Sequence, residues 1–513
     1  MKHQQIARGA LWNATGYVLA GSLAILYPIL LLYWLGRSAY GLVSYLALIV
    51  NQSYLLNLGL GEAMAQQLTA AASRNATSEG IPFIRSALAG VWLVSLVLSL
   101  LWMTFGVEGL SWVFTLQPAE EQLLQTASMW LPPAIWGIQT GMLLGWIPVA
   151  LGQFRSAAIH SLVQTIWQGL FPLLVLSFVP TKSPELALKL ILIGYLLYGL
   201  TMWLLTWRWL GICPYPGRLS LLFFLLRKSI WSGLQGIGTI PYTFVERTLI
   251  GRWASLSLMG FYSAIHFFLS KATGIVIKGL ESLFPVFGSV VDSPTRQALR
   301  LSQSVWILSL GIAIVGLGVW GGLAFLLPLL PVHIGTHERI ILGMGIGFFI
   351  TQAPIVPITT FLQSRGYFRT LFWLNLLPIA AVLVLSPVFV AHGLFFLANV
   401  TGAVGWMMIY STTAFRDKVS RVLWYRWVMP TYGRIVLGWA IGTGGFILLP
   451  LYIGAPVGAG VSAIGLWGLG IGLLLSERYT PSWRAKRIFL GQINQTIRTL
   501  GQGIRRHFLS PVH

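Results

Sequence analysis

The stretch "LWNATGYVLAGSLAILYPILLLYWLG", Leu11 to Gly36, decides the fold class, because it carries no charged residue and is long enough to cross a membrane. A helix of about 20 apolar residues spans the roughly 30 Å hydrocarbon core of a bilayer. No small-residue cleavage site follows, so we interpret the stretch as a first spanning helix and not as a cleavable signal. Similar runs recur along a chain that is 56% hydrophobic and 9% charged, with mean hydropathy +0.77. We therefore expect an all-α polytopic membrane protein.

Length and hydropathy predict about 14 transmembrane helices joined by short loops. The predicted spans are 11–35, 40–64, 82–106, 124–149, 156–179, 187–207, 229–253, 258–285, 303–328, 339–362, 370–391, 394–415, 434–453 and 456–476. The sequence has 33 Lys and Arg against 12 Asp and Glu, a net charge of +21. With both termini in the cytoplasm, most basic residues fall on the cytoplasmic side, as the positive-inside rule requires. This bias explains the charge without a nucleic-acid partner.

An internal repeat relates positions that are 219 residues apart. The matching pairs are Trp12 and Trp231, Trp34 and Trp253, Gly41 and Gly260, Ser44 and Ser263, and Glu62 and Glu281. A later match joins "GQFR" (152–155) to "GYFR" (366–369) after a short deletion. Together these pairs predict that the chain consists of two related halves.

The repeat predicts two six-helix lobes, 1–215 and 220–420, followed by two additional helices in 430–476 and a basic cytoplasmic tail, 477–513. Because six is even, both lobes cross the membrane in the same orientation, so the repeat is parallel and its axis runs along the membrane normal. Many transporters are built in this way, with the pathway between the two lobes.

Two stretches carry a resemblance to a known family. They are "LWNATGYVLAGSLAILYPILLLYWLGRSAYGLVSYLALIVNQSYLLNLGLGEAMAQQL" (11–68) and "SRGYFRTLFWLNLLPI" (364–379). The first resembles the opening of the bacterial Wzx-like polysaccharide flippases of the MOP (multidrug/oligosaccharidyl-lipid/polysaccharide) superfamily, and the second resembles the family's link between helices 10 and 11. These glycine and aliphatic motifs identify a fold better than a substrate.

The resemblance implies a V-shaped protein of the bacterial cytoplasmic membrane. Such a protein would move a polyprenyl-diphosphate-linked oligosaccharide from the inner to the outer leaflet by alternating access. The process would serve a cell-surface polysaccharide such as the O-antigen of lipopolysaccharide. The implied partners are the lipid-linked substrate, membrane lipids, a polysaccharide polymerase or other assembly protein, and a coupling proton or sodium ion. The sequence itself shows no catalytic constellation, so we expect no enzyme activity, no cofactor and no metal.

The span 229–253 carries a polar face. Ser232, Gln235, Thr239, Thr243 and Glu246 recur at three- and four-residue spacing, with Arg247 on the flank. Small and polar stripes pack helices together in many membrane proteins. Here the two charged residues at the end of the stripe favour a water-filled pathway.

The span 258–285 carries a second polar face. Its members are Ser263, His266, Ser270, Lys271, Gly274, Lys278 and Glu281. A charged side chain deep in the bilayer costs at least about 2.5–3.5 kcal/mol, so it persists where it meets water, a counter-ion or a substrate. Lys271 lies about 20 Å below the outer end of the span. Lys278 and Glu281 lie near the inner interface, where snorkelling or mutual pairing is a sufficient explanation.

These patterns give two sets of candidate residues. The first set is predicted to contact the diphosphate in the pathway and consists of Lys271, Arg247, Lys278 and Gln235. The ammonium and guanidinium groups of its three basic residues bind phosphate. Glu62, Glu246, Glu281 and His266 are candidates for ion coupling.

Three alternatives remain at this point. The first is a MATE-like exporter of drugs or other lipids. The second is a membrane-embedded polysaccharide polymerase or ligase, which would need a sizeable outer loop that this sequence lacks. The third is a membrane scaffold, which the intramembrane charges disfavour.

Overall fold

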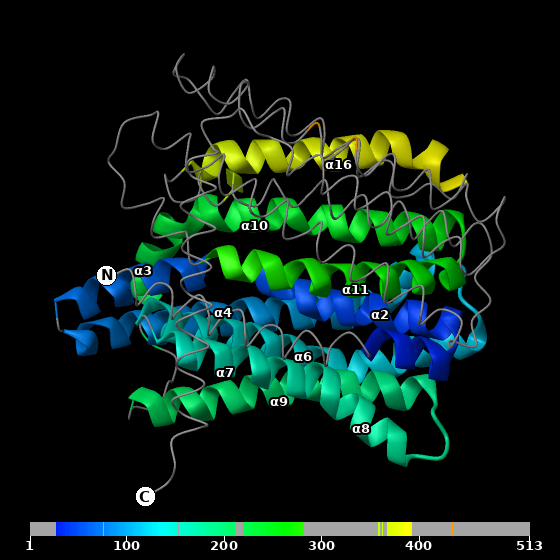
Figure 1. Ribbon diagram of the computed structural model, residues 1–513, viewed down its shortest axis with the longest axis horizontal. Helices are drawn as coiled ribbons and strands as arrows, with labels where there is room; N and C mark the ends of the chain where they lie inside the picture. Colours follow the sequence, from blue (N-terminus) through cyan, green and yellow to red (C-terminus); the bar gives the residue numbers. More distant parts are fainter. Residues whose placement is uncertain are drawn as a thin grey trace, which may run out of the picture.

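The computed structural model describes residues 27–74, 76–151, 153–210, 217, 219–281, 358–359, 362, 367–391, 433 and 437. Residues 27–35 are helical. The elements that follow are α2 (Arg37–Ser53), η1 (Tyr54–Asn57), α3 (Leu60–Ser73), η2 (Thr77–Gly80), α4 (Ile81–Leu101), η3 (Trp102–Gly106), α5 (Val107–Val113), α6 (Pro118–Ala150), α7 (Phe154–Thr165), η4 (Ile166–Leu170), α8 (Phe171–Phe178), α9 (Pro184–Leu210), α10 (Leu219–Trp253), α11 (Leu256–Glu281) and α16 (Phe368–Ala391). Most run side by side as one bundle (Figure 1).

The expected all-α class is confirmed for the described residues. Four of the described helical stretches are long and apolar enough to cross a membrane. They are Arg37–Asn57, Ser78–Val113, Ser156–Phe178 and Pro184–Arg208, and each coincides with a predicted span. The predicted spans at 303–328, 394–415 and 456–476 lie outside the described residues, so the count of about 14 helices stays a prediction.

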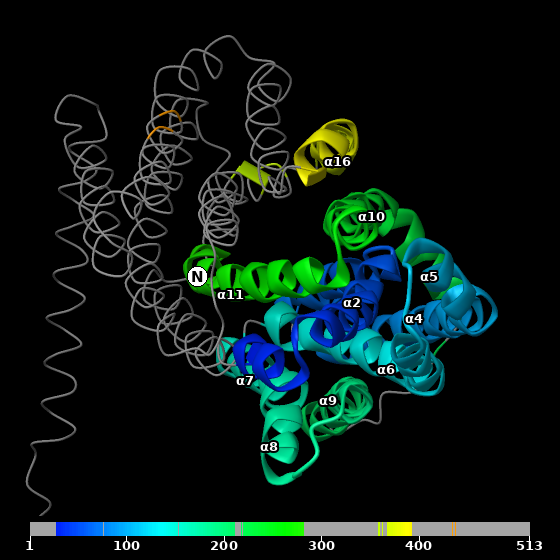
Figure 2. The ribbon, with the colours of Figure 1, turned by 90° about the vertical axis from the view of Figure 1, so that its right-hand side faces the viewer.

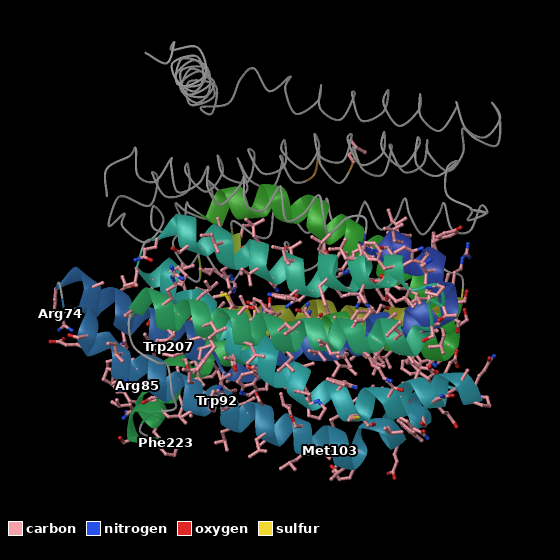
Figure 3. The ribbon with its side chains drawn as sticks, turned by 90° about the horizontal axis from the view of Figure 1, so that it is seen from below. Arg74, Arg85, Trp92, Met103, Trp207 and Phe223 are labelled. Atoms are coloured by element: carbon pink, nitrogen blue, oxygen red, sulfur yellow. The ribbon has the colours of Figure 1, made fainter. Side chains whose placement is uncertain are left out.

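Apolar side chains cover the outside of the bundle. Met103 and Phe223 lie at the edge of the bundle and are 68% and 72% exposed (Figure 3). In water, a patch of this kind would be unfavourable. In a bilayer such side chains contact lipid tails, which agrees with a multi-pass membrane protein.

The predicted span 40–64 is not a single helix. The chain breaks at Leu58 and Gly59, which adopt positive φ angles of 55° and 72°. The Asn57 side-chain oxygen accepts a hydrogen bond of 3.0 Å from the Gly59 amide and supports this turn. The left-handed region suits glycine, whereas Leu58 is held there at some cost in free energy. The break separates α2 from α3, which projects beyond the other helices on the left of Figure 1.

Two helices contain π-helical segments. η3 joins α4 to α5, and η4 joins α7 to α8, without ending either helix. The helix continues through η3 past the predicted end at residue 106 and reaches Val113. A π segment shifts the direction of the side chains that follow it and is frequent at functional sites.

The N-terminal part of the bundle is held by a close crossing of α6 and α9. A Cβ atom at Gly199 would overlap the backbone of Gly137, and one at Gly137 would overlap the carbonyl oxygen of Tyr195. Membrane helices associate through van der Waals packing, and small residues let their backbones approach. These glycines therefore set the distance between α6 and α9.

Adding a methyl group at this crossing should destabilise the protein. We expect Gly199→Ala to reduce stability by about 1–3 kcal/mol because the two helices must move apart. Gly109→Ala is the matched control, since nothing lies within 4 Å of a Cβ atom there. Alanine is the better helix former, so the control should be neutral or slightly stabilising. Thermal unfolding of both full-length variants in detergent checks this, and equal midpoints would contradict it.

Candidate functional site

The candidate site lies where α2 from the first predicted lobe crosses α11 from the second. A Cβ atom at Gly260 would overlap the carbonyl oxygen of Arg37, and one at Gly41 would overlap that of Leu256. Figure 2 shows α11 inclined to the bundle, with one end beside α2 and α10. Two helices that approach so closely leave no room for a passage between them at this level.

Gly41 and Gly260 are also the residues that the sequence repeat pairs. If a twofold axis relates the two halves, equivalent residues that touch one another lie beside that axis. Their contact therefore marks the point where the two predicted lobes meet. By the predicted topology it lies near the outer face of the membrane.

Aromatic side chains surround the glycine crossing. Tyr45 of α2 forms a hydrogen bond of 2.8 Å with the Thr248 hydroxyl of α10. Its ring packs edge-on against Phe114 and Phe244, with centroids 5.1 and 5.8 Å away. These contacts join α2 to α10 beside the α2–α11 crossing.

Glu246 of α10 is buried just below this crossing. Its side chain is 4% exposed, and one carboxylate oxygen accepts a hydrogen bond from the Tyr262 hydroxyl of α11. The other oxygen, Oε1, is buried and has no hydrogen-bond partner among the described residues. An unsatisfied buried polar group costs about 1–3 kcal/mol, and more when it is charged.

Arg247 lies beside Glu246 and is 6% exposed. One guanidinium nitrogen is 3.4 Å from Nδ1 of His266 on α11. Because a guanidinium can only donate, Nδ1 accepts and the proton of the neutral imidazole is on Nε2. Within the described part of the chain, the Nε atom of Arg247 is buried without a partner, as is the hydroxyl of Ser263. The tyrosines Tyr40 and Tyr45 of α2 lie within electrostatic range of the guanidinium.

The depth of this cluster follows from helix geometry. Glu246 and Arg247 precede the last residue of α10, Trp253, by about two turns, which places them roughly 10 Å from the end of the helix. His266 is about 15 Å from the first residue of α11, Leu256. The cluster of Glu246, Arg247, Tyr262 and His266, which we call the polar plug, therefore lies directly beneath the glycine crossing.

The structure brings together three of the predicted site residues, Glu246, Arg247 and His266. The polar stripe of 229–253 predicted a water-filled surface at Glu246 and Arg247. In this conformation both side chains are instead buried between α2, α10 and α11. The reason is that the close glycine crossing brings α2 over the stripe.

The other predicted site residues either lie away from the polar plug or have side chains outside the part that the structure describes. The backbones of Gln235, Lys271, Lys278 and Glu281 belong to α10 and α11, but their side chains are outside the part that the structure describes. Glu62 is half-buried in the first turn of α3. A carboxylate there stabilises the helix dipole, which gives Glu62 a structural role as well.

Sequence reasoning missed the tyrosine of the plug. Tyr262 precedes His266 by four residues and shares its helix face, so the available signal was an aromatic hydroxyl beside a polar stripe. No group of three or more His, Cys, Asp or Glu side chains within the described ranges is arranged to hold a metal ion.

A cleft of about 290 Å³ opens between α2, η1, the α4–η3 helix, α6 and α10. Its lining is apolar except for Gln52 and Ser53 and includes no charged residue among those that the structure describes. Glu246 and Arg247, charged side chains that the sequence singled out, lie at the polar plug and not in this cleft, so we place the candidate site at the plug.

Comparison with solved structures identifies the fold. The chain superposes on the lipid II flippase MurJ in an inward closed conformation, with a TM-score of 0.66 and 13% identity, over 91% of this chain and 98% of that one. The MATE multidrug transporter DinF-BH matches with a TM-score of 0.54 and 13% identity, over 80% and 96% of the two chains. The chain has the fold of the MOP-superfamily transporters.

A MATE transporter of the MOP superfamily in an outward-facing conformation gives a TM-score of 0.52 at 13% identity, over 80% of this chain and 98% of that one. No family model matches the sequence, and no curated protein matches it. At these identities the likeness establishes the fold alone, so the function and the substrate must be argued from the site.

The bond between Tyr262 and Glu246 should contribute measurably to the stability of the plug. We expect Tyr262→Phe to reduce stability by about 1–3 kcal/mol, because it removes the only hydrogen bond that the described residues give to the Glu246 carboxylate. In a double-mutant cycle with Glu246→Leu, which removes the acceptor, the coupling energy should be at least about 1 kcal/mol. Tyr33→Phe, at a 57% exposed tyrosine, serves as the control. Additive effects of the two plug variants would show that the bond contributes nothing.

Proposed function

We propose that the protein is a flippase that moves a polyprenyl-diphosphate-linked oligosaccharide from the inner to the outer leaflet of a bacterial cytoplasmic membrane. The observation that carries the proposal is Arg247, a buried guanidinium whose Nε has no partner among the described residues, at the junction of the two predicted lobes. A permanent cation in this position is costly unless an anion meets it during the transport cycle. The headgroup of such a lipid is a diphosphate, which a guanidinium binds through two parallel hydrogen bonds.

The polar plug also supports alternating access. With α2 packed on α11, Glu246 Oε1 and Arg247 Nε are sealed from water and unsatisfied by any described residue. Each costs about 1–3 kcal/mol in this conformation, and separation of the helices would let water or substrate satisfy both. The closed arrangement is therefore destabilised by the same groups that we assign to the pathway, which keeps the open arrangement within reach.

The order of contacts follows from depth. Lys271 is five residues beyond His266 on α11, about 7 Å closer to the inner face. A diphosphate entering from the inner leaflet would meet Lys271 before Arg247. It would reach Arg247 when α2 and α11 part at the outer face. Lys278 and Gln235 are proposed to extend this path toward the inner side.

The alternative functions, drug export and polysaccharide synthesis, would require different chemical groups at the polar plug. A carrier of cationic drugs would need a buried carboxylate with no basic residue beside it. Here Arg247 adjoins Glu246 and would repel a cation. An integral-membrane polymerase or ligase would need catalytic groups, whereas the similar folds belong to transporters.

We also propose that transport is coupled to a proton or sodium ion, that both termini lie in the cytoplasm, and that the protein cooperates with a polysaccharide polymerase.

Removing the pathway cations should impair transport. We expect Arg247→Ala and Lys271→Ala each to reduce delivery of lipid-linked sugar by about 10–100-fold. This is the effect expected when one charge-assisted hydrogen bond to the substrate is lost. The measurement is recovery of surface polysaccharide in a strain that lacks its flippase, at matched protein levels in the membrane.

Two residues on α10 provide matched controls for that experiment. Arg252→Ala removes an exposed guanidinium that stacks 5.1 Å above Trp112 at the outer end, and Lys228→Ala removes an exposed ammonium near the inner end. Both should retain most of the activity. Full recovery with Arg247→Ala and Lys271→Ala would refute the cationic pathway, and export of a cationic dye without polysaccharide would favour the drug exporter.

A further inference from the structure

A second polar cluster lies inside the first predicted lobe, away from the plug. His160 of α7 forms a hydrogen bond with the hydroxyl of Tyr198 on α9, and the two ring centroids lie 5.6 Å apart. Tyr198 is fully buried, whereas His160 is half-buried. His160 lies within the predicted span 156–179.

The helix packing is shaped to hold these two rings. A Cβ atom at Gly145 of α6 would overlap the His160 imidazole, and one at Gly141 would overlap the Tyr198 ring. The two glycines are four residues apart and therefore lie on the same face of α6.

The hydrogen bonds around Tyr198 allow the histidine to exist in two protonation states. When His160 is neutral, its Nε2 can accept the Tyr198 proton. When it is protonated, both ring nitrogens donate, so the Tyr198 oxygen must accept and its own proton needs another acceptor. The Met142 sulfur lies 3.5 Å from the Tyr198 oxygen and fills that role. Neither state leaves the tyrosine without a partner.

The surroundings of His160 differ from those of His266 in the plug. His266 faces the Arg247 guanidinium. His160 instead contacts the hydroxyl of Tyr198 on α9, and α6 places Gly145 against the imidazole and Met142 against the Tyr198 oxygen.

Other ionisable residues lie on the neighbouring elements. Tyr54 of η1 lies within electrostatic range of Tyr198. Arg155 precedes His160 by five residues on α7, at the inner end of the helix. Glu120 and Glu121 of α6 are near the start of that helix, more than five turns from Gly141.

We propose that His160 and Tyr198 form a proton-binding site, in which His160 takes up one proton from the cytoplasmic side. His160 is about 9 Å from the first residue of α7, Phe154, which places it near the inner face in the predicted topology. The incoming proton binds Nε2, the Tyr198 hydroxyl turns to Met142, and release reverses both steps. Proton binding at His160 does not depend on the proposed transport function. Only the use of this proton as the coupling ion rests on that function.

The test is the protonation of His160 in the full-length protein. Histidine labelled with ¹⁵N and reconstituted in lipid nanodiscs reports neutral and protonated rings by distinct NMR shifts. The His160 signal, assigned by its loss in His160→Gln, should convert between the two forms within the range of about pH 5–8 in which histidines ordinarily titrate. A His160 that stays in one form throughout this range would overturn the proposal.

A second variant separates the site from a general effect of the fold. Tyr198→Phe removes the acceptor of the protonated ring and should reduce the protonated fraction of His160 at about pH 6 by roughly twofold or more. Thr104→Val, which removes an exposed hydroxyl of η3, should leave that fraction unchanged. Equal fractions in wild type and Tyr198→Phe would remove Tyr198 from the site. Because no transport is measured, either result is independent of whether the protein is a flippase.

Discussion

The contact between Gly41 and Gly260 is the constraint on which the rest of the site depends. Without side chains at these two positions, the backbones of α2 and α11 meet directly, and the two predicted lobes close against one another. This approach carries α2 over the end of α10 and buries Glu246 and Arg247, which lie on a polar face. The glycine contact thus decides whether the charged residues face protein or a pathway.

Helix packing at this junction favours the closed arrangement, whereas the buried polar groups oppose it. Dispersion contacts and the Tyr45–Thr248 hydrogen bond favour the closed arrangement. Glu246 Oε1 and Arg247 Nε, which no described residue satisfies, oppose it. A transporter needs two arrangements whose free energies differ by only a few kcal/mol, and these opposing terms have that magnitude. The physical account therefore links the burial of the plug to the proposed cycle.

Much of the architecture could be predicted from the sequence, because spans of apolar residues and the positions of glycine are local signals. The repeat pairs Gly41 with Gly260, which touch in the structure, and the polar stripes identify Glu246, Arg247 and His266. Periodicity gives the face of a helix but not its neighbour. It could not show that Tyr262 would meet Glu246, that α2 would cover the stripe, or that His160 and Tyr198 would pack against Gly141 and Gly145. The turn at Leu58 was also missed, since its backbone conformation is rare for leucine.

The most direct test of the account is the distance between the outer ends of the two lobes. Spin labels at Ser111 of α5 and Ser255, between α10 and α11, with Cys213→Ser to remove the only other thiol, would report it by double electron–electron resonance. We predict two distance populations, closed and open, and a loss of the shorter one in Gly260→Leu because the added side chain cannot fit against Arg37. A single distance that is the same in both proteins would contradict the account.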